Sequence, residues 1–228
     1  MIICLLPFVV IGLAYSIEYE EFYQSLSALG ITAALTYFLS HLGRDLGKKK
    51  EPELWKSWGG PPSSQLLSYG NDEIDPITKD RYHSRMKDIS KFEKDIDFHN
   101  SSLEKLIDIY ESWVRILIAK TRDRKQYPLI FEENVGYGFR RNLWALKPYA
   151  IGLAILSVLG NYVFQLITHG FTNIDDYPVS FFISEIVLIG MIAMWMYVIT
   201  DNWVRVPASA YGKRLLEAID TIHPDRID

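Results

Sequence analysis

The chain has 228 residues and a formal net charge of -4 at pH 7. Because the overall balance is slightly acidic, whole-protein charge gives no reason to expect nucleic-acid binding. The single cysteine, Cys4, excludes an intramolecular disulfide and a metal site built from several cysteines. The mean hydropathy of +0.02 averages strongly apolar stretches with a charged middle segment, so the order of segments along the chain carries the information.

Four apolar stretches stand out in chain order, at residues 2–16, 26–42, 149–168 and 179–200. A helix needs about 20 residues to cross about 30 Å of hydrocarbon, and each stretch comes close to that length. A short connector separates the first two stretches, and another separates the last two. The sequence therefore predicts an all-α membrane protein with four transmembrane helices in two hairpins and an α-helical cytoplasmic insert.

The distribution of basic residues predicts which side of the membrane each segment faces. Residues 1–43 contain neither Lys nor Arg, and both connectors carry acidic residues but no basic ones. By the positive-inside bias, both termini and residues 44–146 face the cytoplasm of a bacterial inner membrane. The predicted domains are a transmembrane hairpin at 1–43, a cytoplasmic helical domain at 44–146, a second hairpin at 147–200 and a cytoplasmic tail at 201–228.

The first apolar stretch has an alternative interpretation as a signal peptide. It is short, it contains Pro7, and the Ala-Tyr-Ser at its end loosely fits a small-x-small cleavage site. It lacks a positively charged start, however, and a second apolar stretch follows closely. A retained hairpin is therefore the favoured interpretation.

Within the insert, the segment that begins at Ser101 predicts an amphipathic helix. Ser101 and Glu104 form a capping box, and apolar residues recur at helical spacing as far as Leu117. Upstream, Trp58 is followed by Gly-Gly-Pro-Pro, which cannot continue a helix. We expect Trp55 and Trp58 to pack onto the apolar helix faces, with base stacking as the alternative.

The chain resembles a family of small, largely uncharacterised bacterial four-span membrane proteins in three motifs: Trp-Gly-Gly-Pro-Pro at 58–62, Thr-Arg-Asp at 121–123, and Glu-Asn-Val-Gly-Tyr-Gly-Phe-Arg-Arg-Asn-Leu-Trp at 133–144. Its architecture also looks like that of membrane effectors of anti-phage defence systems, in which a neighbouring nucleotidyltransferase makes a nucleotide signal that opens a pore. The resemblance implies a homo-oligomeric pore of the inner membrane, gated by a nucleotide or oligonucleotide.

Polar side chains form two stripes along the predicted spans. In span three, Ser157, Asn161 and Gln165 recur at intervals of four and share one helix face. In span two the stripe comprises Thr32, Thr36 and Ser40. An amide is too costly to leave against lipid, so it requires a partner helix or water. Two interpretations stay open: hydrogen bonds that hold the helices together, or the lining of a water-filled pore formed by several copies of the chain.

Glu185 is an acidic residue within the fourth apolar stretch. As a pore residue it would belong to a cation-attracting ring of carboxylates at the outer mouth. The alternative is a carboxylate that reaches water near the membrane interface. The sequence alone leaves both interpretations open.

Two groups of basic residues before the third span form the candidate ligand-binding site: Arg122, Arg124, Lys125, Arg140 and Arg141. Arginine can bind phosphate at two points, and residues just before a spanning helix could pull on that helix when a ligand binds. Arg140 and Arg141 are also what membrane topology and attraction to anionic lipid demand. Phosphate recognition and membrane anchoring therefore remain alternatives.

Catalytic signatures are absent from the sequence, which has no Walker loop, no His-Glu-x-x-His and no Gly-x-Ser-x-Gly. We therefore expect no enzyme activity, no cofactor and no metal site. The leading hypothesis is a homo-oligomeric membrane effector whose cytoplasmic domain senses a nucleotide-like anion and whose spans disrupt the membrane. The alternative is a membrane-anchored adaptor or scaffold that recruits a cytoplasmic partner without forming a pore.

Overall fold

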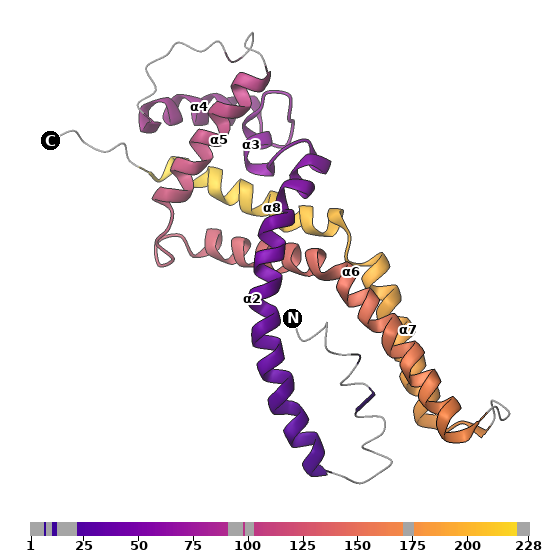
Figure 1. Cartoon of the computed structure of the whole chain (residues 1–228). Coiled ribbons are helices and arrows are strands. Elements are labelled where there is room, and N and C mark those ends of the chain that lie inside the picture. The colour runs from indigo at the N-terminus through magenta and orange to yellow at the C-terminus, as the bar shows by residue number, and fades with distance from the viewer. Residues whose placement is uncertain are drawn as a thin grey trace. The chain divides into compact units, whose positions relative to one another are not determined.

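A computed structural model describes residues 7, 11–12, 22–90, 98, 103–170 and 176–222, apart from the side chains of 22–36, 103–105 and 169. The described residues form helices and no strand, which confirms the all-α fold class (Figure 1). The helices are α2 Phe22–Trp58, α3 Pro62–Leu67, α4 Pro76–Ser90, α5 Leu103–Lys120, α6 Pro128–His169, α7 Val179–Tyr197, α8 Asp201–Glu217 and the 3-10 turn η3 Ala218–Asp220.

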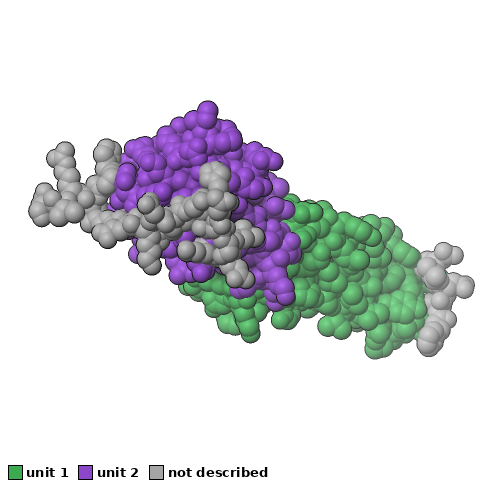
Figure 2. Space-filling model, turned by 90° about the horizontal axis from the view of Figure 1, so that it is seen from above, with its two compact units in different colours: residues 1–50, 140–203 green, residues 51–139, 204–228 purple. Residues whose placement is uncertain are grey.

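The chain divides into two compact units, which Figure 2 shows in green and purple. Unit 1 comprises Met1–Lys50 and Arg140–Trp203, and unit 2 comprises Glu51–Phe139 and Val204–Asp228. The division runs through α2, α6 and α8, so each of these helices contributes residues to both units. Each unit is described by itself below.

Two helices of the described residues are long and apolar enough to cross a membrane, Pro128–Thr168 and Val179–Tyr197. The most apolar 18-residue windows of these helices have mean hydropathies of 1.9 and 2.0, and only 28% of each window is buried. The core helix of a soluble protein would be mostly buried, so this exposure favours a lipid-facing role. Length and composition thus indicate membrane association at the third and fourth predicted spans.

The structure describes the first two predicted spans only in part. Most of residues 2–16 lie outside the described residues. Residues 26–42 are helical within α2, but the side chains through Thr36 also lie outside the described part of the chain. The four-span, two-hairpin arrangement and the orientation of the termini therefore stay predictions.

In unit 1, α6 and α7 pack through a small apolar cluster. Leu143, Leu146 and Ala150 of α6 are buried against Trp195 and Ile199. Between helices in lipid, close packing of side chains rather than removal of apolar surface from water favours association, and these buried side chains supply that packing. The cluster thus joins the third and fourth predicted spans.

Lys147 of α6 donates hydrogen bonds to carbonyl oxygens at the end of α7. Its Nζ donates to the carbonyl oxygen of Met196 at 3.1 Å and to that of Ile199 at 2.9 Å. The last carbonyls of a helix have no partner within the helix, and a positive charge there also complements the helix dipole. Directly afterwards Thr200 accepts a hydrogen bond from the backbone of Trp203 and so caps the start of α8.

In unit 1 α2 also passes close to α6, at Gly47. A side-chain carbon at this position would overlap the Asn142 side chain and approach its Cα to 3.2 Å. Only glycine allows the two backbones to come this near. Gly47 therefore fixes the crossing point of the two helices.

The core of unit 2 is built from α3, α4, α5, the first part of α6, α8 and η3. Leu106, Tyr110, Val114 and Leu117 are buried, as the periodicity of the amphipathic segment predicts. Trp113, which the prediction did not include, is fully buried at 0% exposure. The predicted helix is therefore confirmed, and its buried face also includes Trp113.

The Gly-Gly-Pro-Pro sequence ends α2 and starts α3, as predicted. Gly59 and Gly60 adopt φ values of 82° and 133°, which side-chain-bearing residues rarely adopt. Gln65 holds the turn because its Nε2 donates to the carbonyl oxygens of Trp58 at 2.6 Å and Gly60 at 3.0 Å. Trp58 itself is only 7% exposed, in agreement with a packing role.

Residues 204–228 of the predicted C-terminal tail belong to unit 2. Leu215, Leu216 and Ile219 of this segment are fully buried in the same core as α4 and α5. Gly212 lies against α3, where an added side-chain carbon would approach Ser63 and Leu66 to 3.1 Å. The helical insert is therefore completed by residues that follow the last apolar stretch.

Candidate functional site

The polar stripe of α6 lies in the contact with α7. Asn161 is 5% exposed, and its Nδ2 donates to Ser184 Oγ and to Glu185 Oε1, both at 2.9 Å. Ser184 is fully buried and donates in turn to the carbonyl oxygen of Phe181 at 2.8 Å. Figure 1 shows the two helices running side by side. Asn161, Ser184 and Glu185, here called the hairpin polar group, thus link the two helices.

The other members of the stripe behave differently from one another. Ser157 is 7% exposed and donates to the carbonyl oxygen of Leu153 at 2.9 Å, so its hydroxyl is satisfied within its own helix. Gln165 is 1% exposed on the same face as Asn161. In the described pair of helices Asn161 therefore supplies interhelical hydrogen bonding. A pore lining stays a prediction for an assembly of several chains.

The predicted stripe of span two is described only at its end. Ser40 donates to the carbonyl oxygen of Tyr37 at 2.6 Å, a bond within the same helix. The side chains of Thr32 and Thr36 lie outside the described residues. Their proposed place in a pore lining stays a prediction.

The predicted ligand-binding residues fall into the two units. Arg122, Arg124 and Lys125 are exposed in the connection between α5 and α6, in unit 2. Arg124 stacks on Phe131, with its guanidinium carbon 4.3 Å from the ring centroid. These side chains are accessible to an anion from solvent.

Arg140 and Arg141 are half-buried residues of unit 1. Arg140 donates to the carbonyl oxygen of Trp203 at 2.9 Å and lies 4.7 Å from the centroid of its ring. Arg141 lies beside Asn142, with nitrogen–oxygen distances of 3.3 and 3.4 Å. Because part of the Arg140 guanidinium already joins α6 to α8, the geometry favours anchoring over ligand recognition at this residue.

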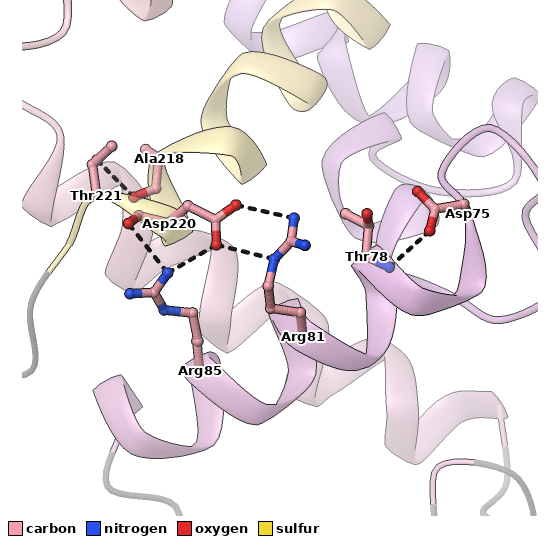
Figure 3. Close-up of polar contacts among 7 residues, drawn as sticks. All are labelled: Asp75, Thr78, Arg81, Arg85, Ala218, Asp220 and Thr221. Carbon is pink, nitrogen blue, oxygen red and sulfur yellow. Dashed lines mark hydrogen bonds and ion pairs between the residues drawn. The ribbon is translucent and has the colours of Figure 1, made fainter.

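A third arginine pair, absent from the predicted site, converges on one carboxylate in unit 2 (Figure 3). Arg81 donates to Asp220 through Nε and Nη2, both at 3.2 Å, and Arg85 donates to it at 2.9 Å. Arg85 also donates to the Asp220 carbonyl oxygen at 3.2 Å. The two arginines are one turn apart on α4, so they share a face.

Each end of this contact belongs to a short-range structural feature. Asp75 caps α4 by accepting the Thr78 N–H at 2.9 Å, and these hydrogen bonds hold the pKa of the Asp75 carboxyl below its usual range (Figure 3). Asp220 ends η3, so the arginines also meet the negative end of a helical turn. All three side chains are more than a third exposed, which makes this a screened surface contact of modest strength.

His83 occupies the buried aromatic centre of unit 2 at 3% exposure. Its Nε2 lies 2.8 Å from the Leu67 carbonyl oxygen, and its ring lies within 5.5 Å of the rings of Phe98, Tyr110 and Trp113. Burial lowers the pKa of His83 and raises that of Tyr110 to about 12. His83 and Tyr110 are 3% and 1% exposed, so this cluster serves the core.

Metal-ligating side chains do not gather anywhere in the described parts of the chain. Among those residues no group of three or more His, Cys, Asp or Glu side chains could hold an ion. The polar features that remain are the hairpin polar group in unit 1 and the exposed basic residues of unit 2. Comparison of the chain with models of protein families, with curated proteins and with solved structures finds no match.

Proposed function

We propose that the chain is a homo-oligomeric effector of the bacterial inner membrane that forms or opens a pore in anti-phage defence. In this proposal the cytoplasmic helical domain receives a nucleotide-like anionic signal made by a neighbouring enzyme. The observation that carries the proposal is the hairpin polar group, which places an amide, a hydroxyl and a carboxylate within the apolar parts of two helices.

The hairpin polar group is more than an inert anchor needs. Ionisable residues within spanning helices are rare, and they commonly mark ion pathways or assembly contacts. Around the group the helices expose large apolar side chains, including Ile167 at 80% and Ile186 at 71%, as lipid-facing surfaces do. Glu185 is only half-buried, so part of its carboxylate remains accessible to a neighbouring chain or to water.

Several copies are required because two or four helices are too few to enclose an aqueous pathway. A ring of subunits would bring one Glu185 from each chain toward the axis and create a cation-attracting mouth. Cyclic assembly is a common form of homo-oligomer, and it multiplies a single weak charge into a strong local field. This assembly is part of the proposal.

Signal reception is proposed for the exposed basic residues between α5 and α6. Arg122, Arg124 and Lys125 are accessible, and arginine offers planar two-point contacts to phosphate. They directly precede α6, the helix that also contains the third predicted span. An anion bound there could bias the position of that helix.

Depolarisation of cells tests the proposal. The chain is expressed with and without its neighbouring genes while membrane potential is recorded, first as the parent and then with Glu185→Gln. The amide keeps an acceptor for Asn161 but removes the charge, so abundance should be retained while depolarisation is reduced. Asp176→Asn is the matched control, because it removes an exposed carboxylate that lies outside α6 and α7. Absence of depolarisation in the parent under every condition would refute the pore.

An adaptor without a pore is the second candidate, and one observation favours it. The Nδ2 group of Asn161 has two acceptors inside its own hairpin, so this amide nitrogen is satisfied without further copies. An adaptor predicts that no variant depolarises cells and that a soluble partner co-purifies with the full chain. Loss of that partner after changes confined to unit 2 would support this candidate over the first.

A further inference from the structure

The first part of α6 carries an apolar stripe on its exposed side. Phe131, Val135 and Phe139 are 38%, 54% and 48% exposed, and they lie at intervals of four on one helix face. Ile130 and Tyr137 of the same segment are buried at 9% and 7%. The segment therefore presents apolar side chains on two sides, of which only one is covered within the chain.

Ordinary folding does not account for the exposed stripe. Single exposed apolar residues are normal, but a continuous row of two phenylalanines and a valine marks an interaction surface. The buried face is already fixed, because Ile130 belongs to the core of unit 2 and the Tyr137 hydroxyl donates to Glu51 Oε1 at 2.6 Å. The other face is therefore available to a surface outside the described fold.

The position of the stripe points to a lipid surface. Phe139 precedes the apolar stretch that begins at Tyr149 by ten residues, about 15 Å along a helix. Pro148 lies between them inside α6. Proline removes a backbone donor and bends helices, so a helix can turn from a spanning direction toward the membrane plane at this point.

Charges beside the stripe fit an anionic membrane surface. Arg124 stacks on Phe131, and Arg122 and Lys125 are exposed in the adjoining connection. Amphipathic helices that lie in a membrane interface combine aromatic or aliphatic side chains with flanking basic residues in this way. Asp123, between the basic residues, and Glu132, next to the stripe, are also exposed and oppose such binding, which limits the expected charge contribution.

We propose that the exposed face of Phe131, Val135 and Phe139 lies in the headgroup boundary of the same membrane that α6 enters. The apolar side chains enter the boundary while Arg122, Arg124 and Lys125 contact lipid phosphates. This inference requires that α6 spans the membrane, but it does not require a pore. It gives the basic residues before α6 a lipid partner in the resting protein, for which a soluble anion would compete.

Depth-dependent fluorescence quenching of the full chain tests the proposal. In a Cys4→Ser background, a polarity-sensitive fluorophore is attached at Val135→Cys, with Phe139→Cys as a second stripe position. Ile77→Cys, an exposed position of α4 at 78%, is the control for the solvated surface, and Ile167→Cys is the control for the span. The proteins are reconstituted in vesicles of phosphatidylethanolamine and phosphatidylglycerol that contain nitroxide-bearing lipid.

The proposal predicts that lipid-borne quencher reduces emission at Val135 and Ile167 but not at Ile77, and that more phosphatidylglycerol deepens the loss at Val135. Quenching of the Val135 label by aqueous iodide alone would overturn it. The Val135 label could instead be reached by neither quencher while energy transfer occurs between labelled chains. That result would show that a second copy of the chain covers the stripe, and it would also overturn the proposal. Absence of lipid quenching at Ile167 would instead refute the span, while depolarisation separately tests the pore.

Discussion

Acid should destabilise unit 2 through one histidine, and His83→Phe should remove that sensitivity. His83 is 3% exposed, and burial is the main cause that lowers its pKa from 6.5. The Leu67 carbonyl oxygen and Asp80 favour the protonated ring, whereas Lys87 and Lys79 oppose it. Because the net effect is a lowered pKa, the folded unit keeps the imidazole neutral at a pH where the unfolded chain binds a proton.

The sign and size follow from proton linkage. A group whose pKa is lowered by folding contributes stability that is present above its unfolded pKa and is lost as the pH falls below it. One proton corresponds to at most about 1.4 kcal/mol per pH unit, so the step from pH 6.5 to 5.5 should cost unit 2 up to about 1 kcal/mol. The loss stops once the pH falls below the pKa of the folded state.

Hydrogen exchange of α5 peptides in the full chain measures this loss, after correction for the intrinsic pH dependence of exchange. His83→Phe should lower stability at neutral pH, because the buried Leu67 carbonyl loses its partner at a cost of about 1–3 kcal/mol. The protection of α5 amides from exchange should nevertheless change less between pH 6.5 and 5.5 in the His83→Phe variant than in the parent. Equal acid sensitivity in the two proteins would refute the reasoning.

Three further substitutions probe contacts that lie within unit 1 or within unit 2. Gly47→Val should lower the melting temperature in detergent because the valine side chain would overlap Asn142. Gly138→Ala is the control: the added Cβ would meet no atom within 4 Å, so the melting temperature should stay unchanged or rise. Lys147→Met should cost about 1–3 kcal/mol in denaturation by detergent because two carbonyls at the end of α7 lose a charged donor, and an arginine there should restore part of it. Asp220→Asn should cost at most about 1 kcal/mol, and a loss that high salt does not diminish would contradict its assignment as a screened surface contact.

Local patterns were sufficient to predict much of the fold. Apolar length identified the parts of α6 and α7 that can cross a membrane, because lipid demands a continuous apolar run. Helical spacing identified the buried face of α5, and Gly59 and Gly60 identified the end of α2 because few other residues adopt their backbone angles. These features depend on neighbouring residues only.

Long-range contacts could not be predicted in the same way. Arg81 and Asp220 are 139 positions apart, and no local pattern connects an arginine of α4 with the end of the chain. The exposure of Phe131 could not be predicted either, because apolar residues at helical spacing ordinarily indicate a core. For Asn161 the sequence required a partner, but only the pairing of α6 and α7 identified Ser184 and Glu185.

Conductance of the purified full chain in planar bilayers tests the central claim most directly. Protease protection first establishes insertion, and small-molecule extract from cells that express the neighbouring genes is then added to the cytoplasmic side. The account predicts discrete current steps in the parent and steps of lower cation selectivity after Glu185→Gln. Inserted protein that carries no current above that of lipid alone, with or without the extract, would contradict the account and leave the chain a membrane-anchored adaptor.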